Sequence, residues 1–137
     1  MNNATIRQAV AEDSKAIVAF LDPFIRAKQL LPRSESEVQT LLPYGFVAES
    51  EGAIVGFAAV EIYSTKLAEI QCLAVSNQFR RQGIGKQLVE RCVQVAKERE
   101  VCELMAITSM EQVFVECGFD YSLPDQKRAL FIQTKQR

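Results

Sequence analysis

Two periodic patterns of apolar residues alternate along this chain. Short runs rich in β-branched and aromatic residues predict strands; they cover residues 5–10, 46–50, 53–63, 66–75, 103–108, 119–122 and 129–134. Apolar residues spaced three or four positions apart predict amphipathic helices; these cover residues 14–24, 34–41, 84–96 and 111–117. Pro23 lies inside the first of these helices, so we expect a local kink or an end there.

Local turn and capping signals support these boundaries. Glu51-Gly52 suits a tight hairpin turn between two strands, and Ser34 with Glu37 forms the capping box that opens a helix. Gly118 fits the position just after the last helix. No repeat, low-complexity tract or linker divides the sequence, so we expect one domain over residues 1–137. Antiparallel strand pairs followed by a β-α-β-α segment predict a mixed α/β fold.

Composition removes several classes of function. The 137 residues include no histidine, which excludes Ser-His-Asp and Cys-His catalysis and every metal site that needs histidine. The net charge of −1 supplies no broad basic field for nucleic acid. No run approaches the roughly 18 apolar residues of a membrane span, and the N-terminus lacks the apolar core of a signal peptide. The four cysteines form no CxxC pair, so we expect reduced thiols, no metal and a cytoplasmic location.

The junction between the strand at 66–75 and the helix at 84–96 carries the strongest chemical signal. Arg80, Arg81 and Lys86 gather three cations in a chain without net positive charge. Two nearby glycines let the backbone approach a ligand closely, and the unpaired N–H groups and dipole of a helix start attract an anion. We therefore predict a phosphate or pyrophosphate site, although glycines also occur at such junctions only to make a tight turn.

This junction resembles a known acyl-CoA signature. Arg80-x-x-Gly83-x-Gly85 is similar to the [RQ]-x-x-G-x-[GA] motif of the GNAT N-acetyltransferases, and Phe114-x-x-x-Gly118-Phe119 sits where that family has a matching segment. The resemblance covers residues 5–134. It implies a single GNAT-like domain with a central, mostly antiparallel and twisted sheet of six to seven strands, splayed at the fourth strand and flanked by about four helices.

The same resemblance implies that acetyl-CoA is the cosubstrate. The main chain of Leu73, Ala74 and Val75 would meet the pantetheine arm. The pyrophosphate would lie on the turn formed by Arg80, Arg81, Gln82, Gly83, Ile84, Gly85 and Lys86. Many GNAT enzymes place a tyrosine general acid beside the cofactor, where this chain has Phe114. The leaving thiolate would then take its proton from solvent or another group.

Acetyl transfer to an amine needs a base, because only a neutral amine is nucleophilic. Without histidine, Glu69 is the best placed candidate, since it lies on the strand that leads to the turn. A polar residue at this place could also be no more than the exposed side of a half-buried strand. Cys72, three residues on, would lie on the opposite face of a regular strand unless a bulge intervenes.

A closer resemblance is to the acetyltransferase domain of bacterial N-acetylglutamate synthases. It is carried by residues 30–34, 69–75 and 114–119. It implies that Glu69 removes the proton through a water molecule, that Cys72 lies by the substrate amine and that Thr108 helps to hold the water. The acceptor, with its carboxylate on the arginine, would be bound by Leu31, Arg33 and Lys127.

The chain departs from those synthases where they clamp glutamate with further arginines. The corresponding regions here hold Ser109-Met110-Glu111-Gln112 and, later, Lys127, Arg128 and Lys135. Lysine replaces a bidentate arginine poorly, so we predict a small amine or amino acid as acceptor, without choosing glutamate. Two alternatives remain open: a non-catalytic acyl-CoA sensor or partner-binding module, and a nucleotide- or phosphoprotein-binding domain. Apolar residues such as Phe131 and Ile132 would suit a homodimer.

Overall fold

The computed structural model describes residues 4–136 and shows a mixed α/β fold, as predicted. Its elements, in chain order, are β1 (Thr5–Gln8), α1 (Ser14–Arg26), α2 (Glu35–Leu41), β2 (Gly45–Ser50), β3 (Ala53–Ile62), β4 (Leu67–Val75), α3 (Ile84–Glu98), β5 (Glu103–Met105) and α4 (Glu111–Glu116). The ends of the predicted 1–137 domain, residues 1–3 and 137, lie outside the described residues. Among residues 4–136, no helix combines the length and apolar character needed to cross a membrane.

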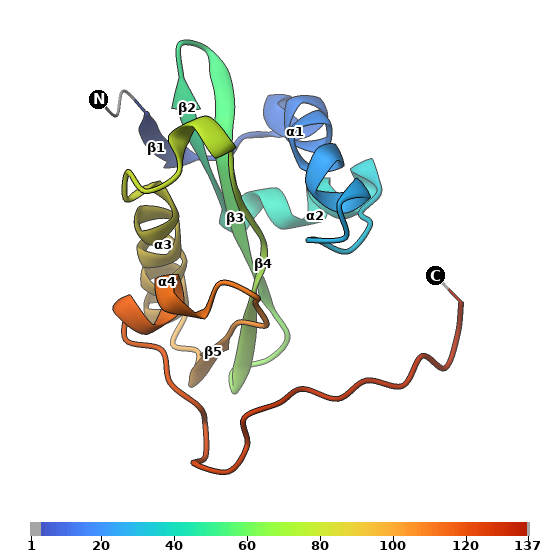
Figure 1. Ribbon diagram of the computed structural model, residues 1–137, viewed down its shortest axis with the longest axis vertical. Helices are drawn as coiled ribbons and strands as arrows, with labels where there is room; N and C mark the ends of the chain where they lie inside the picture. The colour runs from blue at the N-terminus through green and yellow to red at the C-terminus, as the bar shows by residue number, and fades with distance from the viewer. Residues whose placement is uncertain (1–3, 137) are drawn as a thin grey trace.

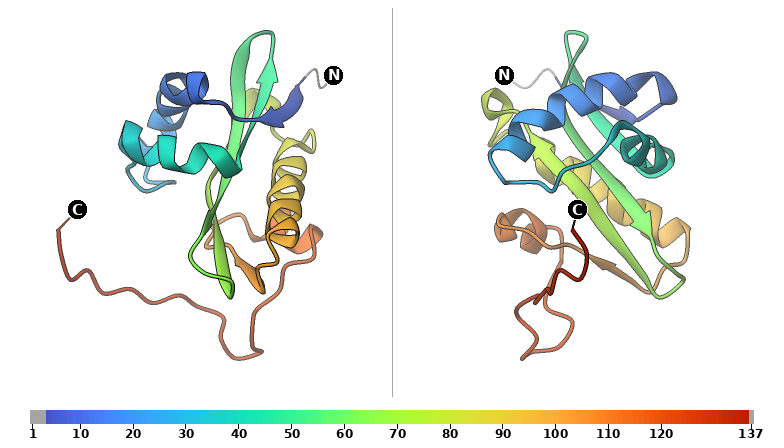
Figure 2. Two further views of the ribbon diagram at one scale, coloured as in Figure 1. Left: turned by 180° about the vertical axis from the view of Figure 1, so that it is seen from behind. Right: turned by 90° about the vertical axis from the view of Figure 1, so that its right-hand side faces the viewer.

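The sheet lies between two layers of helices. Figures 1 and 2 show α1 and α2 on one face and α3 and α4 on the other. Each face has its own hydrophobic cluster: Ile17, Leu21 and Val38 belong to the cluster under α1 and α2, whereas Leu88 and Phe114 belong to the cluster under α3 and α4. Burial of both faces is what fixes the helices to the sheet.

The sheet has the strand order β1-β2-β3-β4-β5. The first three pairings are antiparallel, and only β4 and β5 run parallel. The parallel pairing joins Leu67–Glu69 to Glu103–Met105 and then stops, while β4 continues to Val75. Beyond Glu69 no described strand pairs with β4 on the β5 side. This open edge is where the sequence predicts the splay at the fourth strand, and the splay itself stays a prediction.

The predicted number of strands is wrong, since the described residues contain five instead of six or seven. Residues 119–122 and 129–134 form no strand, and the chain after α4 runs as an extended segment away from the sheet (Figures 1 and 2). Leu130, Phe131 and Ile132 are 90%, 78% and 86% exposed. An apolar run has a high propensity for strand, but a stable strand also needs a neighbouring strand and a surface to pack on.

The expectation that Pro23 ends or kinks the first helix fails as far as the end is concerned. α1 continues through Pro23 to Arg26, and the N–H of Ala27 donates to the Pro23 carbonyl oxygen at 3.0 Å. A proline inside a helix costs about 3 kcal/mol. Ile17 and Leu21 are fully buried against the sheet, which contributes about 1.5–3 kcal/mol for each side chain. Tertiary packing therefore outweighs the local cost.

Candidate active site

A β-bulge interrupts β4 in the middle of the predicted site. Phe57 pairs with Ala74 and Ala59 pairs with Gln71, so β4 holds one more residue than β3 between these two pairs. Cys72 lies in this stretch and has a φ of 61°, a left-handed conformation that few residues other than glycine adopt. The bulge that the sequence left open is present.

The bulge decides which face of the sheet Cys72 occupies. Ile70 packs in the cluster under α3, whereas Cys72, two residues later, packs in the cluster under α1 and α2. Residues two apart share a face in a regular strand, so the extra residue has moved Cys72 across. Glu69 and Gln71 alternate with Ile70 and therefore share the α1/α2 face. The bulge thus brings Cys72 to the side of Glu69.

A hydrogen-bond network surrounds Glu69 on this face. The Tyr63 hydroxyl donates to Glu69 Oε1 at 2.7 Å. Gln71 Nε2 lies 3.2 Å from Glu69 Oε1, from Glu61 Oε1 and from the Tyr63 hydroxyl oxygen. On the other side of the same amide, Arg33 Nη2 donates to Gln71 Oε1. We call these five residues the acceptor network, because they connect the loop before α2 with the ends of β3 and β4.

The environment raises the pKa of two groups in this region. Burial, and then the hydrogen bond to Glu69, raises the pKa of Tyr63 to about 12, although half of its side chain is exposed. Burial also raises the pKa of the Cys72 thiol, against the opposing effect of the nearby Arg33 guanidinium. Both groups therefore stay protonated at neutral pH, and Cys72 is a poor nucleophile because the thiolate is the reactive form.

A cleft of about 520 Å³ opens next to Arg33. It is lined by Leu31, Pro32, Arg33, Ser34 and Glu37. Arg33 Nε is buried and has no acceptor among the described residues. A buried N–H without a partner is costly, so this group is suited to an anionic ligand atom. The capping box of α2, in which Glu37 N donates to Ser34 Oγ at 3.2 Å, forms part of the wall of the cleft.

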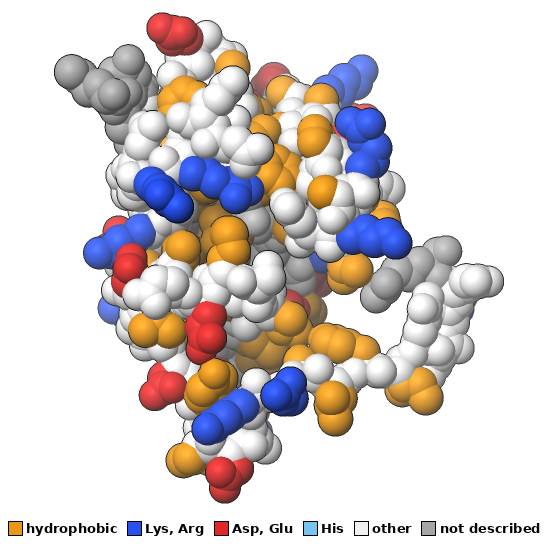
Figure 3. Space-filling view, in the orientation of Figure 1, with side chains coloured by type: hydrophobic (Ala, Val, Ile, Leu, Met, Phe, Trp, Pro, Cys, Tyr) orange, Lys and Arg blue, Asp and Glu red, His pale blue; other side chains and the backbone are white. Residues whose placement is uncertain are grey.

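The turn before α3 has the geometry of an anion site. Gly83 is the N-cap residue of α3 with a φ of 81°, and Arg81 has a φ of 63°. In the described part of the chain, the backbone N–H groups of Ile84, Gly85 and Lys86 donate to no protein acceptor. Figure 3 shows Lys and Arg side chains over the segment between β4 and α3, above a hollow with apolar walls. This arrangement favours a phosphate group.

Close packing fixes the position of this turn over the sheet. A Cβ atom on Gly56 of β3 would lie 3.1 Å from Leu88 Cδ1 and 3.3 Å from Ile84 Cγ2. Glycine therefore lets the first turns of α3 lie this near the strand without a shift of these side chains. The sequence analysis did not identify Gly56, because nothing in its local pattern separates it from an ordinary strand residue.

The structure places the other predicted cofactor residues in two different settings. Leu73, Ala74 and Val75 lie on β4 beyond the splay, where one edge of the strand has no partner strand among the described residues. Ile84 and Phe114 are only 1% and 4% exposed. Their side chains belong to the core under α3, and Phe114 packs edge-on against Phe119 at 5.3 Å. Their direct contact with a cofactor stays a prediction.

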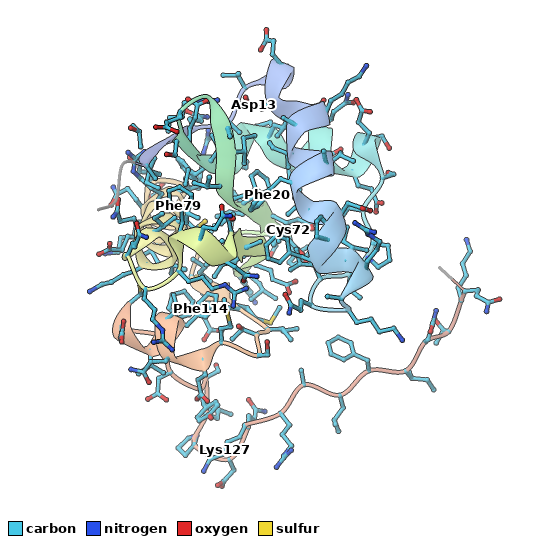
Figure 4. The ribbon with its side chains drawn as sticks, turned by 45° about the horizontal axis from the view of Figure 1, so that its top comes forward. Asp13, Phe20, Cys72, Phe79, Phe114 and Lys127 are labelled. Atoms are coloured by element: carbon cyan, nitrogen blue, oxygen red, sulfur yellow. The ribbon has the colours of Figure 1, made fainter. Side chains whose placement is uncertain are left out.

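Two predicted residues lie outside the acceptor network. Thr108 is exposed in the segment after β5, and its Oγ1 accepts from the Met110 N–H at 2.8 Å. Lys127 lies on the extended C-terminal segment, well away from Cys72 on β4 (Figure 4). Within residues 4–136 no cluster of cysteine, aspartate and glutamate side chains has the form of a metal site.

Three members of the acceptor network were missed by the sequence analysis, namely Glu61, Tyr63 and Gln71. A signal for them exists: polar residues at every second position on both sides of a hairpin place their side chains on one face. Glu61 faces Glu69 directly in the register of β3 and β4. Like charges in directly opposite positions destabilise a sheet, which marks the pair as unusual.

Comparison with known proteins agrees with this geometry. The model of the acetyltransferase (GNAT) family matches residues 10–119. An uncharacterized N-acetyltransferase of Chlorobaculum tepidum is 33% identical over 114 residues, which are 83% of this chain and 74% of that protein. An amino-acid acetyltransferase of Pasteurella multocida is 29% identical over 133 residues, 93% of this chain and 30% of the relative.

A solved structure gives the same picture in three dimensions. N-acetylglutamate synthase from Neisseria gonorrhoeae, complexed with coenzyme A and N-acetyl-glutamate, superimposes with a TM-score of 0.78 at 28% identity. The match covers 93% of this chain and 30% of that protein. The chain thus spans about a third of the length of the amino-acid acetyltransferases that it resembles.

Proposed function

Because the chain belongs to the GNAT acetyltransferase family and is an acetyl-CoA-dependent N-acetyltransferase, we propose that it acetylates the amine of a small molecule, with an amino acid as the favoured class. The observation that carries this choice is the buried Arg33 Nε beside the cleft, which lacks an acceptor among the described residues. A substrate carboxylate would supply that acceptor. The relatives named as amino-acid acetyltransferases support the same class.

The cofactor would lie along β4, with its pyrophosphate near Val75 and its thioester near Glu69. Its pyrophosphate would sit on the N–H groups at the start of α3, with the side chains of Arg80, Arg81 and Lys86 around it. Its pantetheine arm would pair with the open edge of Leu73–Val75 as an added strand does. The seven residues from Glu69 to Val75 span roughly 20 Å, so the thioester would reach the network around Glu69.

The reaction would be a direct transfer of the acetyl group. Glu69 would take a proton from the acceptor ammonium through a water molecule, with Thr108 as a further contact of that water. The amine nitrogen would then attack the thioester carbonyl carbon, and strand N–H groups would stabilise the oxyanion. The nitrogen then loses its second proton to solvent, the C–S bond breaks, and the CoA thiolate takes a proton from solvent. No metal ion is needed for any of these steps.

Cys72 would shape the acceptor site instead of carrying the acetyl group. The raised pKa of its thiol keeps the sulfur protonated at neutral pH, which argues against a covalent acetyl-cysteine intermediate. Its position on the Glu69 face places it next to the amine in the proposed complex. Leu31, 51% exposed at the rim of the cleft, would contact the apolar part of the acceptor, with Lys127 as a second cationic contact.

We further propose that two copies associate. Leu130, Phe131 and Ile132 form an exposed apolar run, and β5 is the last strand of the sheet, with one edge unpaired among the described residues. Such an edge readily accepts another strand. Light scattering coupled to size exclusion should show a dimer that is lost when Phe131 and Ile132 are replaced by lysine; a monomer for the unaltered protein would contradict this.

An acceptor panel tests the proposed activity. Release of CoA from acetyl-CoA should be measured with amino acids, amino acid amides, polyamines and peptides, with Glu69→Gln as the matched variant. We expect the greatest kcat/KM with an acceptor that carries a free carboxylate. Competition of CoA against ATP for the same site tests the cofactor, because only CoA would use both the turn and the strand. A preference for polyamines, or for an amide over its acid, would overturn the amino acid assignment.

A further inference from the structure

We propose that Tyr63 and Gln71 are positioning residues that hold one oxygen of Glu69 and leave the other free for the water of the reaction. This inference rests on the proposed role of Glu69 as the base. Tyr63 and Gln71 both donate to Oε1 of Glu69, at 2.7 and 3.2 Å. Among residues 4–136, Oε2 of Glu69 accepts no hydrogen bond. The carboxylate is thus anchored through one atom and available through the other.

The orientation of the Gln71 amide follows from its partners. Arginine has only donors, so the amide atom that faces Arg33 must be the oxygen, and the NH₂ group must face Glu69. Arg33 therefore sets the direction in which Gln71 donates. Gln71 is only 8% exposed, so packing also holds it in place. The same contact joins the proposed carboxylate-binding residue to the proposed base.

The number of hydrogen atoms limits the arrangement of the network. Gln71 Nε2 has two hydrogens but three oxygens at 3.2 Å, on Glu61, Tyr63 and Glu69. The Tyr63 hydroxyl gives its single hydrogen to Glu69, so its oxygen is free to accept. The amide and the hydroxyl thereby place donors between two carboxylates that lie directly opposite each other. These donors stabilise a pair of charges that would otherwise repel.

Tyr63 acts here through its hydrogen bond and not as a proton source. A pKa of about 12 places its phenol well above a free thiol, at about 8.5. Transfer of its proton to the leaving thiolate would be uphill. The phenol instead stays protonated and keeps donating to Glu69 throughout the neutral range.

A set of four substitutions tests this role. Tyr63→Phe and Gln71→Met each remove a donor to Glu69 and keep the size of the side chain. Tyr121→Phe and Gln112→Met are matched controls, because both residues are exposed. Tyr121, which follows α4, donates to Glu111 at 3.0 Å, and Gln112, on α4, donates to Glu116 at 3.1 Å. We expect kcat to fall about 10- to 100-fold in the first two variants, since a displaced catalytic group costs that much. The KM for acetyl-CoA and both controls should stay unchanged.

Double variants separate positioning from general damage. A residue that acts through Glu69 has nothing to position once Glu69 is replaced, so Tyr63→Phe should lower kcat no further in the Glu69→Gln background. An equal loss in both backgrounds would overturn the proposal, and so would an unchanged kcat in both single variants.

A crystal structure of Gln71→Met keeps the inference distinct from the proposed function. A shifted Glu69 carboxylate supports anchoring even if Glu69→Gln leaves kcat unchanged, in which case only the base assignment fails. A carboxylate that stays in place would overturn the anchoring itself.

Discussion

The two ends of β4 solve the binding problem in different ways. The end next to α3 relies on the main chain: a left-handed glycine, a helix start and N–H groups without protein acceptors among the described residues. The end around Glu69 relies on side chains from three separate parts of the chain, joined by hydrogen bonds. A main-chain site depends on backbone shape, which many sequences can adopt, whereas the acceptor network depends on the identity of each residue.

The two ends of β4 also differ in charge. Basic side chains gather over the turn (Figure 3). The proposed binding of a pyrophosphate there involves no proton transfer. The acceptor network combines Glu61 and Glu69 with a single arginine, which suits the proposed acceptor with one ammonium group and one carboxylate. The following substitutions separate the two ends by asking which kinetic constant each one changes.

The largest effect is expected from Glu69→Gln. The amide keeps the shape of the side chain but cannot accept a proton, so kcat should fall by roughly 10²- to 10⁴-fold. The dissociation constant of CoA, measured by calorimetry, should stay the same because the turn is untouched. An unchanged kcat across the pH range would remove Glu69 from the role of base.

Gly83→Val probes the opposite end. A β-branched residue at a φ of 81° costs about 1–2 kcal/mol, which should distort the turn and weaken CoA binding about tenfold. Gly52→Val is the matched control, because Gly52 has a φ of 79° in the β2–β3 hairpin. Both variants should lose similar stability, but only the first should bind CoA more weakly. The same CoA affinity in Gly83→Val and Gly52→Val would show that the turn does not bind the cofactor.

Arg33→Met is expected to change acceptor binding, and to lower kcat through Gln71, whose amide Arg33 orients. Loss of a charged hydrogen bond costs about 1.5–3 kcal/mol, so the KM for a carboxylate-bearing acceptor should rise at least tenfold. The KM for an acceptor whose carboxylate is an amide should show little change. Arg26→Met is the control, since Arg26 lies at the end of α1 and pairs only with the exposed Asp22 among the described residues. An equal rise in KM for the acid and for its amide would contradict the assignment of Arg33 to the carboxylate.

Cys72→Ala should have the smallest effect. Because burial raises the thiol pKa, the sulfur is protonated below that pKa and becomes a thiolate only as the pH rises through it. Activity near neutral pH should therefore change by no more than about threefold. Mass spectrometry of the unaltered protein with acetyl-CoA should show no acetyl-cysteine. Cys92→Ala, buried under α3, controls for the lost packing. Loss of activity in Cys72→Ala but not in Cys92→Ala would support an acetyl-cysteine intermediate on Cys72.

The sequence predicted the local geometry of the turn before α3 better than the hydrogen bonds of the acceptor network. A strand, two glycines and a helix start are local features, so the turn could be assigned from neighbouring letters. Gln71 gains its importance from Arg33, 38 positions away, and no local pattern reports such a contact. The bulge at Cys72 was similarly out of reach, because register is set by the partner strand.

The C-terminal segment shows the converse error. Its apolar alternation near Phe131 has the composition of a strand, yet the described sheet ends at β5. Propensity states what a segment suits, and only a partner decides what it forms. The expected helix end at Pro23 is wrong for a related reason, since burial of neighbouring side chains keeps α1 continuous through it.

The extra residue in β4 places Cys72 on the same face as Glu69, so that substitutions near the acceptor and substitutions near α3 fall on opposite faces of the sheet. Glu69, Gln71 and Cys72 lie on the face toward α1 and α2, while α3 packs on the reverse side of the sheet. In the proposed complex, substitutions that change the amine pocket would therefore fall on the opposite surface from the helix that holds the thioester carrier. The acetyl donor could then be kept while its recipient is exchanged, because the sheet separates the two.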